Sequence, residues 1–296
     1  MTRRSTGATG AAGGPVAGSA RASRLGEAIP AAITLAGMIA TPLARRGGPV
    51  RRTLSTVVVS GLFATTSAAA ARRWGAPRTA IAASGVAAAT TAVEHLGTAT
   101  GRPFGAYGYT GALRPQVAGV PAIVPLAWFA MAVPARETAH AALAQHSTPA
   151  RRIALGAVAL TAWDLFLDPQ MVGEGYWRWV RAGRYRGIPV TNYLGWLATS
   201  AAVMAALEVA LPPDGEADRS LVAEYGVMAG METLGFAAFF RDRVVAVVGG
   251  AAMMPIAAAA ARSLLRTRHW HDVRGERSAG GVRLRADVRF GGTARG

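Results

Sequence analysis

Residues 244–265 read VVAVVGGAAMMPIAAAAARSLL, an apolar run in which Arg262 is the one charged residue. About 20 helical residues, at about 1.5 Å each, cross the hydrocarbon core of a bilayer, which is about 30 Å thick. Comparable apolar runs precede this one at 25–44, 53–71, 79–97, 120–142, 153–172, 191–211 and 220–240. The pattern predicts an all-α fold, a polytopic transmembrane helix bundle of about seven or eight spans.

Composition supports this interpretation. Charged residues make up 16% of the chain and hydrophobic residues 51%, with a mean hydropathy of +0.26, whereas soluble domains carry about 25% charged residues. The alternative is a large soluble protein with buried Ala-rich helices. Soluble helices show a polar face every 3.6 residues, and most of these runs lack one. We therefore expect an integral, multi-pass membrane protein that has the lipid bilayer as a partner.

The chain is basic, with a formal net charge of +16, and all 32 of its basic residues are arginine. Several arginine pairs stand at the ends of apolar runs, where they can meet lipid head groups: Arg45-Arg46, Arg51-Arg52, Arg72-Arg73 and Arg151-Arg152. No basic helix is interleaved with aromatic residues, so we expect no nucleic-acid partner. Cysteine is absent, which excludes disulfides, thiolate catalysis and cysteine metal ligands. The membrane orientation stays open.

Three regions divide the chain. Residues 1–24 form an Arg/Gly/Ala-rich tail, residues 25–266 the transmembrane helical domain, and residues 267–296 an Arg/Gly-rich C-terminal tail. Both tails are expected to be disordered. Two connections inside the domain, 98–119 and 173–190, combine Gly and Pro with aromatic residues and Arg, which predicts ordered loops at the membrane interface.

Carboxylates inside the apolar runs are the main candidates for chemistry, because each costs at least ~2.5 kcal/mol in hydrocarbon. Glu94 lies near the end of the third run, and Asp164 and Asp168 lie near the end of the fifth, four residues apart and on one helical face. Two such carboxylates cannot both ionise cheaply, so one should keep a proton, which an alkene could accept. The alternative is a structural cluster paired with loop arginines.

Two further residues leave their role open. His95 lies beside Glu94, where a role in the chemistry and a satisfied structural hydrogen bond are both compatible with the sequence. Glu232 lies well inside the seventh run, and the sequence does not decide whether it faces the same cavity as the other acids.

Several metal and cofactor chemistries are excluded by missing motifs. Di-iron hydroxylases need clustered histidines, and this chain has five scattered ones. The Asp164/Asp168 pair is only a partial match to the aspartate-rich motifs that hold Mg²⁺ against a diphosphate, and no second such motif accompanies it. No phosphate-binding loop, metalloprotease motif or dinucleotide fingerprint is present. We expect no metal and no cofactor.

A series of motifs between about residue 90 and about residue 200 resembles a known family. The motifs are Glu94-His95-Leu96-Gly97, GRPFGAYGYT at 101–110, GVPAIVPLAW at 119–128, WDLFLDPQM at 163–171, the pair Trp177 and Trp179, and GRYRGIPVTNYLGW at 183–196. In order and spacing they resemble the membrane carotenoid biosynthesis family that includes the carotenoid 1,2-hydratases and bisanhydrobacterioruberin hydratase.

The resemblance implies a cofactor-independent addition of water to the terminal double bond of an acyclic carotenoid. Asp164 or Asp168 would protonate the alkene, the partner carboxylate would stabilise positive charge, and Glu94, with His95, would orient the water. The remaining residues expected at the substrate are Tyr107, Tyr109, Trp163, Trp177, Trp179, Asn192 and Glu232. For the aromatic residues, an interfacial belt that anchors the loops is the alternative.

Other functions remain open. A cyclase would trap the same cation with an internal alkene instead of water, and a prenyltransferase-like enzyme would depend on Mg²⁺ and a diphosphate. A small transporter would spread its carboxylates along a path across the membrane, whereas these acids cluster near the ends of the runs. The resemblance also implies the bacterial plasma membrane as the location, with other carotenoid-pathway membrane enzymes as partners.

Overall fold

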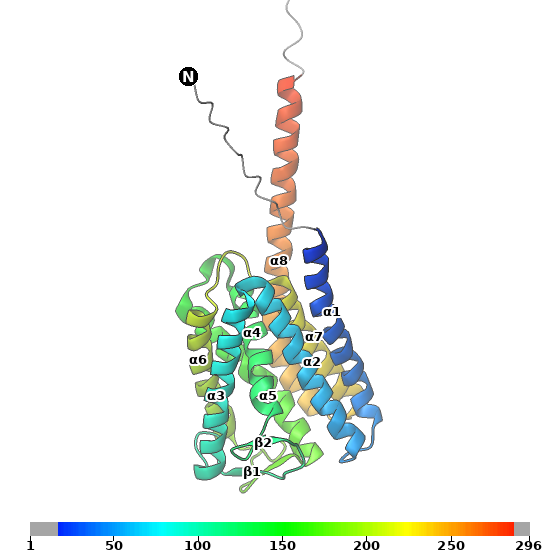
Figure 1. The fold of residues 1–296 in the computed structure, drawn as a ribbon, viewed down its shortest axis with the longest axis vertical. Coiled ribbons are helices and arrows are strands. Elements are labelled where there is room, and N and C mark those ends of the chain that lie inside the picture. The colour runs from blue at the N-terminus through cyan, green and yellow to red at the C-terminus, as the bar shows by residue number, and fades with distance from the viewer. Residues whose placement is uncertain (1–16, 287–296) are drawn as a thin grey trace, which may run out of the picture.

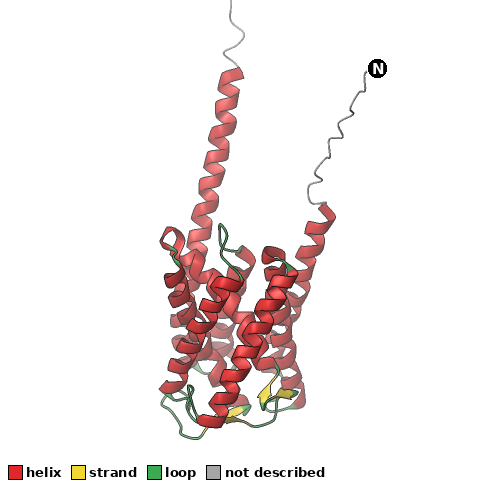
Figure 2. Cartoon of the chain, turned by 60° about the vertical axis from the view of Figure 1, so that its left-hand side comes forward, coloured by secondary structure: helices red, strands yellow, loops and turns green. Residues whose placement is uncertain are grey.

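The structure is a computed structural model that describes the backbone of residues 17–286 and the side chains of residues 25–267. The described chain is an up-and-down helix bundle (Figures 1 and 2). Its helices are α1 (Ala17–Ala40), α2 (Pro49–Trp74), α3 (Ala76–Thr100), α4 (Ile123–Leu143), α5 (Pro149–Glu174), α6 (Val190–Ala210), α7 (Arg219–Leu234) and α8 (Arg243–Ala286). Short helical turns are η1 (Thr41–Leu43), η2 (Ala144–His146) and the π-helical η3 (Gly235–Phe239).

Two small antiparallel ribbons lie in the loops. Strand β1 (Tyr107–Tyr109) pairs with β4 (Trp177–Trp179), and β2 (Gln116–Val117) pairs with β3 (Val120–Pro121). All of them lie at one end of the bundle, opposite the end where α1 begins and α8 projects (Figure 1). We call these the strand end and the far end.

The predicted all-α fold is confirmed, and in the described residues each of the eight helices overlaps one of the eight apolar runs. Four helical segments of the described chain are long and apolar enough to cross a membrane: Leu25–Leu43, Pro49–Trp74, Val190–Ala210 and Arg243–Thr267. The count of seven or eight spans therefore stays a prediction.

The helix ends depart from the predicted tails. Helix α1 begins at Ala17 and α8 continues to Ala286, so parts of both stretches expected to be disordered are helical. The division of the chain into a helical domain at 25–266 and two tails stays a prediction. Residues 1–16 and 287–296, the remainder of the two predicted tails, lie outside the described residues.

Helix α4 is the centre of the bundle and contacts α2, α3, α5, α6, α7 and α8. Nearly all of its side chains from Pro125 to Ala141 are buried. A helix that is apolar or small on every side has no preferred outer face and is buried all round. Ala130, Ala132 and Ala135 let the neighbouring helices approach closely.

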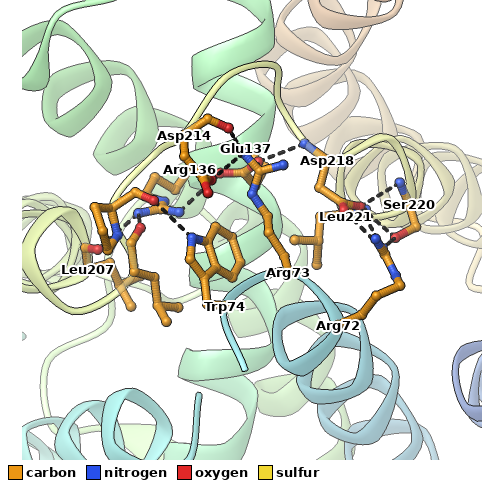
Figure 3. A network of polar contacts seen from close by, with 12 residues as sticks. Arg72, Arg73, Trp74, Arg136, Glu137, Leu207, Asp214, Asp218, Ser220 and Leu221 are labelled. Carbon is orange, nitrogen blue, oxygen red and sulfur yellow. Dashed lines mark hydrogen bonds and ion pairs between the residues drawn. The ribbon is translucent and has the colours of Figure 1, made fainter. Parts of the chain in front are cut away.

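A buried polar network joins four segments at the far end (Figure 3). Arg136 of α4 donates from Nη2 to Glu137 Oε1 at 3.0 Å and from Nη1 to the Leu207 carbonyl of α6 at 2.9 Å. Glu137 Oε2 accepts from the backbone N–H of Asp218 at 2.7 Å. The network therefore fixes the loop before α7 against the central helix.

Asp218 caps α7 within this network. Its carboxylate accepts from the backbone N–H of Ser220 and of Leu221 and from Arg72 at 2.9 Å. Burial acts to raise the pKa of Asp218, but the hydrogen bonds from Ser220 and the charge of Arg72 outweigh it and hold the pKa below its usual value. The ionised cap therefore stabilises the start of α7.

Candidate active site

Three helices bring the predicted acids together near the strand end. Glu94 of α3 and Asp164 and Asp168 of α5 are all buried, and Asn192 lies beside them in the first turn of α6. The side-chain nitrogen of Asn192 donates to Asp164 Oδ2 at 2.9 Å and also to Asp168 Oδ2. The four-residue spacing of the aspartates places them on one helical face, as predicted, and one amide bridges them.

The two aspartates have different surroundings. Asp168 lines a cavity and accepts a hydrogen bond from the Trp177 indole at 3.0 Å. Asp164 lies behind it, outside the lining, and its Oδ1 has no hydrogen-bond partner among the described residues. The two carboxyl groups contact the same amide nitrogen, that of Asn192. A buried carboxylate oxygen without a hydrogen-bond donor destabilises the fold. One proton shared by the two aspartates would remove this cost.

Glu94 accepts hydrogen bonds from three aromatic donors. Tyr107 and Tyr109 both donate to Oε2, the latter at 2.9 Å, and the Trp128 indole donates to Oε1 at 3.2 Å. A carboxylate has about four acceptor positions, so one position, on Oε1, stays available. An indole N–H can only donate, so Oε1 of Glu94 acts as an acceptor toward Trp128.

The tyrosines come from the β1–β4 ribbon, which covers the acids. The register pairs Tyr107 with Trp179 and Tyr109 with Trp177. Because side chains alternate along a strand, these four aromatic residues share one face, and all four line the cavity. Tyr107 stacks on Trp179 with ring centroids 5.6 Å apart.

Both tyrosines stay protonated donors. Burial, reinforced by the negative charge of Glu94, raises the pKa of Tyr107 and of Tyr109 well above the usual value. Their hydroxyl groups therefore hold Glu94 from the loop side.

The acids and the ribbon enclose one end of a cavity of about 270 Å³. Nine of the predicted site residues line it: Glu94, Tyr107, Tyr109, Trp163, Asp168, Trp177, Trp179, Asn192 and Glu232. Glu232 enters from α7, away from the other acids. The position of Glu232, which the sequence left open, is therefore on the wall of the same cavity.

His95 is not part of this arrangement, contrary to the expectation that it helps to orient water. Successive residues of a helix point about 100° apart, so the side chain next to buried Glu94 turns outward. His95 is exposed, and its Nδ1 lies 2.9 Å from the carbonyl oxygen of Ala118. This is the structural hydrogen bond that the sequence offered as the alternative.

Five aromatic residues of the cavity were not among the predicted site residues: Phe104, Trp128, Trp196, Phe239 and Phe240. Trp128 stacks on Trp196 with ring centroids 3.9 Å apart, and Trp163 meets Trp196 edge-on at 6.3 Å. Phe104, Trp128 and Trp196 lie within the motifs quoted above, whereas Phe239 and Phe240 lie outside them. For Phe104, Trp128 and Trp196, membership of those motifs was the sequence feature that could have identified them as site residues. An isolated aromatic residue in an apolar helix indicates only packing.

The hydrogen-bond donors around the acids come from the chain itself. Within residues 25–267, no three His, Asp or Glu side chains are grouped in a way that could hold a metal ion. The oxygens of Glu94 and Asp168 instead accept from tyrosine, tryptophan and asparagine. This arrangement can hold a proton and stabilise positive charge inside an apolar, aromatic cavity.

Comparison with known proteins identifies the family. A family model described as "Carotenoid biosynthesis protein" matches residues 48–265, which include every helix from α2 to α7 and all the predicted site residues. No curated protein matches the chain, and no solved structure matches it either. The match confirms the predicted family, and together with the apolar helices it identifies a membrane protein. The chain therefore belongs to the carotenoid biosynthesis protein family.

Proposed function

We propose that this chain is a hydro-lyase that adds water to the terminal double bond of an acyclic carotenoid, without a metal or cofactor. The observation that carries the proposal is the placement of Asp168 and Glu94 on the wall of one aromatic cavity, with Asp164 directly behind Asp168. A role in carotenoid biosynthesis comes from the family match. The choice of hydration is our inference from this geometry.

Asp168 is the proton donor in this proposal. The aspartate pair shares one proton because two carboxylates on one amide, away from water, repel each other when both are ionised. Asp168 is the member that the cavity exposes to a substrate. Its proton goes to the less substituted alkene carbon, and the π electrons form the new C–H bond. A tertiary carbocation and an ionised aspartate pair remain.

The surrounding groups stabilise that cation. The faces of Tyr107, Trp177 and Trp179 provide cation–π attraction, worth about 2 kcal/mol or more per ring in a desolvated site. Glu94 adds a negative charge that its three donors already hold in place. A preorganised charge of this kind lowers the barrier without reorganisation during the reaction.

Water completes the reaction. Glu94 has one acceptor position left on Oε1, and the indole N–H of Trp163 has no hydrogen-bond partner among the described residues. These two groups can orient a water molecule in the cavity. The water oxygen bonds to the cationic carbon and its proton returns to the ionised aspartate pair, with Glu94 as the intermediate acceptor. The sum is alkene plus water giving a tertiary alcohol, with no net oxidation.

The membrane setting suits this substrate. We propose that all eight helices span the bacterial plasma membrane, so that a polyene dissolved in the bilayer brings its tip to the strand end. The acids lie about two turns from the ends of α3 and α5, close to the interface from which water can enter. Other carotenoid-pathway membrane enzymes are the expected partners, because they would supply the acyclic substrate.

The test is pigment analysis of a lycopene-producing host that expresses the chain. We expect a product heavier by one water, with its oxygen derived from ¹⁸O-labelled water, and unchanged activity of the isolated membranes in chelator. Asp168→Asn, which removes the proposed proton donor, should abolish the product, whereas Asp214→Asn, at the far end, should not. A cyclic product without oxygen would indicate a cyclase instead. Oxygen derived from O₂, or dependence on Mg²⁺ and a diphosphate, would refute the proposed reaction.

A further inference from the structure

The cavity extends away from the acids toward α1 and α7. The lining there includes Met38, Ile39 and Pro42 from α1 and η1, and Leu234, Phe239 and Phe240 from α7, η3 and the residue that follows. These side chains are apolar, and Thr41 and Glu232 are the polar residues that the same elements add to the lining. The acid cluster, by contrast, is built by α3, α5 and α6. The cavity therefore has an acidic, aromatic end and an apolar end.

Three residues of the apolar end both line the cavity and face the outside. Ile39 is 54% exposed, Leu234 is 64% exposed and Phe239 is 59% exposed. Three such side chains on neighbouring segments indicate an opening of the cavity at this place. The cavity therefore has a lateral mouth between α1–η1 and α7–η3, and its rim is formed by these three apolar side chains.

The packing of the helices explains why the mouth lies there. Among the described residues, the main helix partner of α1 is α2, so the side of α1 toward α7 is less tightly packed. The π-helical turn of η3, in which the Phe240 N–H donates to the Gly235 carbonyl at 2.9 Å, widens the end of α7. Turns of this kind recur at functional sites. Here the turn places Phe239 and Phe240 on the cavity lining.

We propose that this mouth is the entry for the substrate's polyene chain, directly from the hydrocarbon of the bilayer; the inference rests on the proposed hydration of a carotenoid end group. A cavity of about 270 Å³ is small, because drug-sized ligands already need about 300–1,000 Å³. It holds the end group, and the rest of a long polyene must project from the mouth into lipid. The enzyme thus selects substrates by their tip and leaves the remaining chain length unrestricted.

The test uses single cysteines, which are unique labelling sites because the chain has none. Ile39→Cys and Phe239→Cys carry a fluorophore at the rim. Leu194→Cys is the matched control, because Leu194 is 61% exposed on α6 at the same end of the bundle and does not line the cavity. The labelled proteins are reconstituted in phosphatidylcholine vesicles and titrated with lycopene, whose polyene quenches nearby fluorophores.

We expect saturable quenching at positions 39 and 239, and at 194 only the gradual quenching caused by lycopene in the lipid. In a second measurement, Ile39→Trp should narrow the mouth and lower the hydration rate at least tenfold, while Leu194→Trp stays within twofold of the wild type. Equal, unsaturable quenching at the three positions would overturn the lateral entry. Saturable quenching at the rim in a protein that hydrates nothing would retain the entry and refute the proposed function.

Discussion

Replacing Asp168 with asparagine tests the proposed proton donor most directly. The side chain keeps its shape, and the amide cannot supply a proton to an alkene. In the wild type, Asp168 Oδ1 accepts from the Trp177 indole and Oδ2 accepts from Asn192. In Asp168→Asn one of these two donors must face the new NH₂ group. The substitution therefore removes the acid and one buried hydrogen bond together.

Each loss has an expected size. General acid catalysis contributes about 10²–10⁴-fold to a rate, so hydration should fall by that factor. A buried donor left without its acceptor costs about 1–3 kcal/mol, which lowers the unfolding temperature modestly and leaves the protein folded. Asp164→Asn should cost less stability, because its new NH₂ can replace Oδ1, which has no partner in the described structure.

The assay compares purified variants in vesicles. Chromatography of the pigments gives the hydration rate, and tryptophan fluorescence during heating gives the stability. Asp214→Asn is the control, since Asp214 is exposed and pairs with Arg73 at the far end. A folded Asp168→Asn protein that keeps more than a third of the wild-type rate would refute Asp168 as the proton donor.

Three further substitutions test other parts of the structure. Gly97→Ala places a methyl group 2.9 Å from the Phe104 ring and 3.1 Å from the Tyr107 ring. This should displace the Tyr107 hydroxyl from the acid cluster and lower the hydration rate about tenfold. An unchanged rate would contradict this prediction. Glu137→Gln leaves the buried Arg136 charge unpaired and should destabilise the protein by about 3–5 kcal/mol in thermal unfolding, without changing the rate per folded molecule. Asp218→Asn tests the pH dependence of stability. The pKa of Asp218 is lower in the folded protein than in the unfolded chain, where it is about 4, so the ionised side chain stabilises the fold above about pH 4. This stabilisation is lost as the pH falls through the pKa of the folded state. Between pH 5 and 3 the variant should therefore lose less stability than the wild type, and equal losses would exclude the cap as the cause.

Much of the fold was predictable because the signals are local. The length of an apolar run is set by the thickness of a bilayer, so the runs located all eight helices of the described chain. The four-residue spacing of Asp164 and Asp168 likewise fixed their common face. The ends of the chain were harder to predict. The arginine and glycine residues after residue 266 suggested disorder, but helix α8 continues through them to Ala286.

The remainder depended on contacts between distant residues. Nothing near Tyr107 in the sequence indicates that it pairs with Trp179 across another loop. The bridging role of Asn192 depends on how α6 packs against α5, and the outward turn of His95 depends on which side of α3 faces the core. The sequence therefore suggested which residues take part in the site but could not assign their roles.

The two-residue period of the β1–β4 ribbon limits how these loops can vary. Gly108 and Arg178 are exposed between the aromatic residues that face the cavity, so exchanges at these two positions leave the covering of the acids intact. Deleting or inserting a single residue in either strand would instead move its side chains to the opposite face of the ribbon, so that the aromatic rings would point toward solvent. Length, more than composition, is the quantity that this part of the chain must preserve.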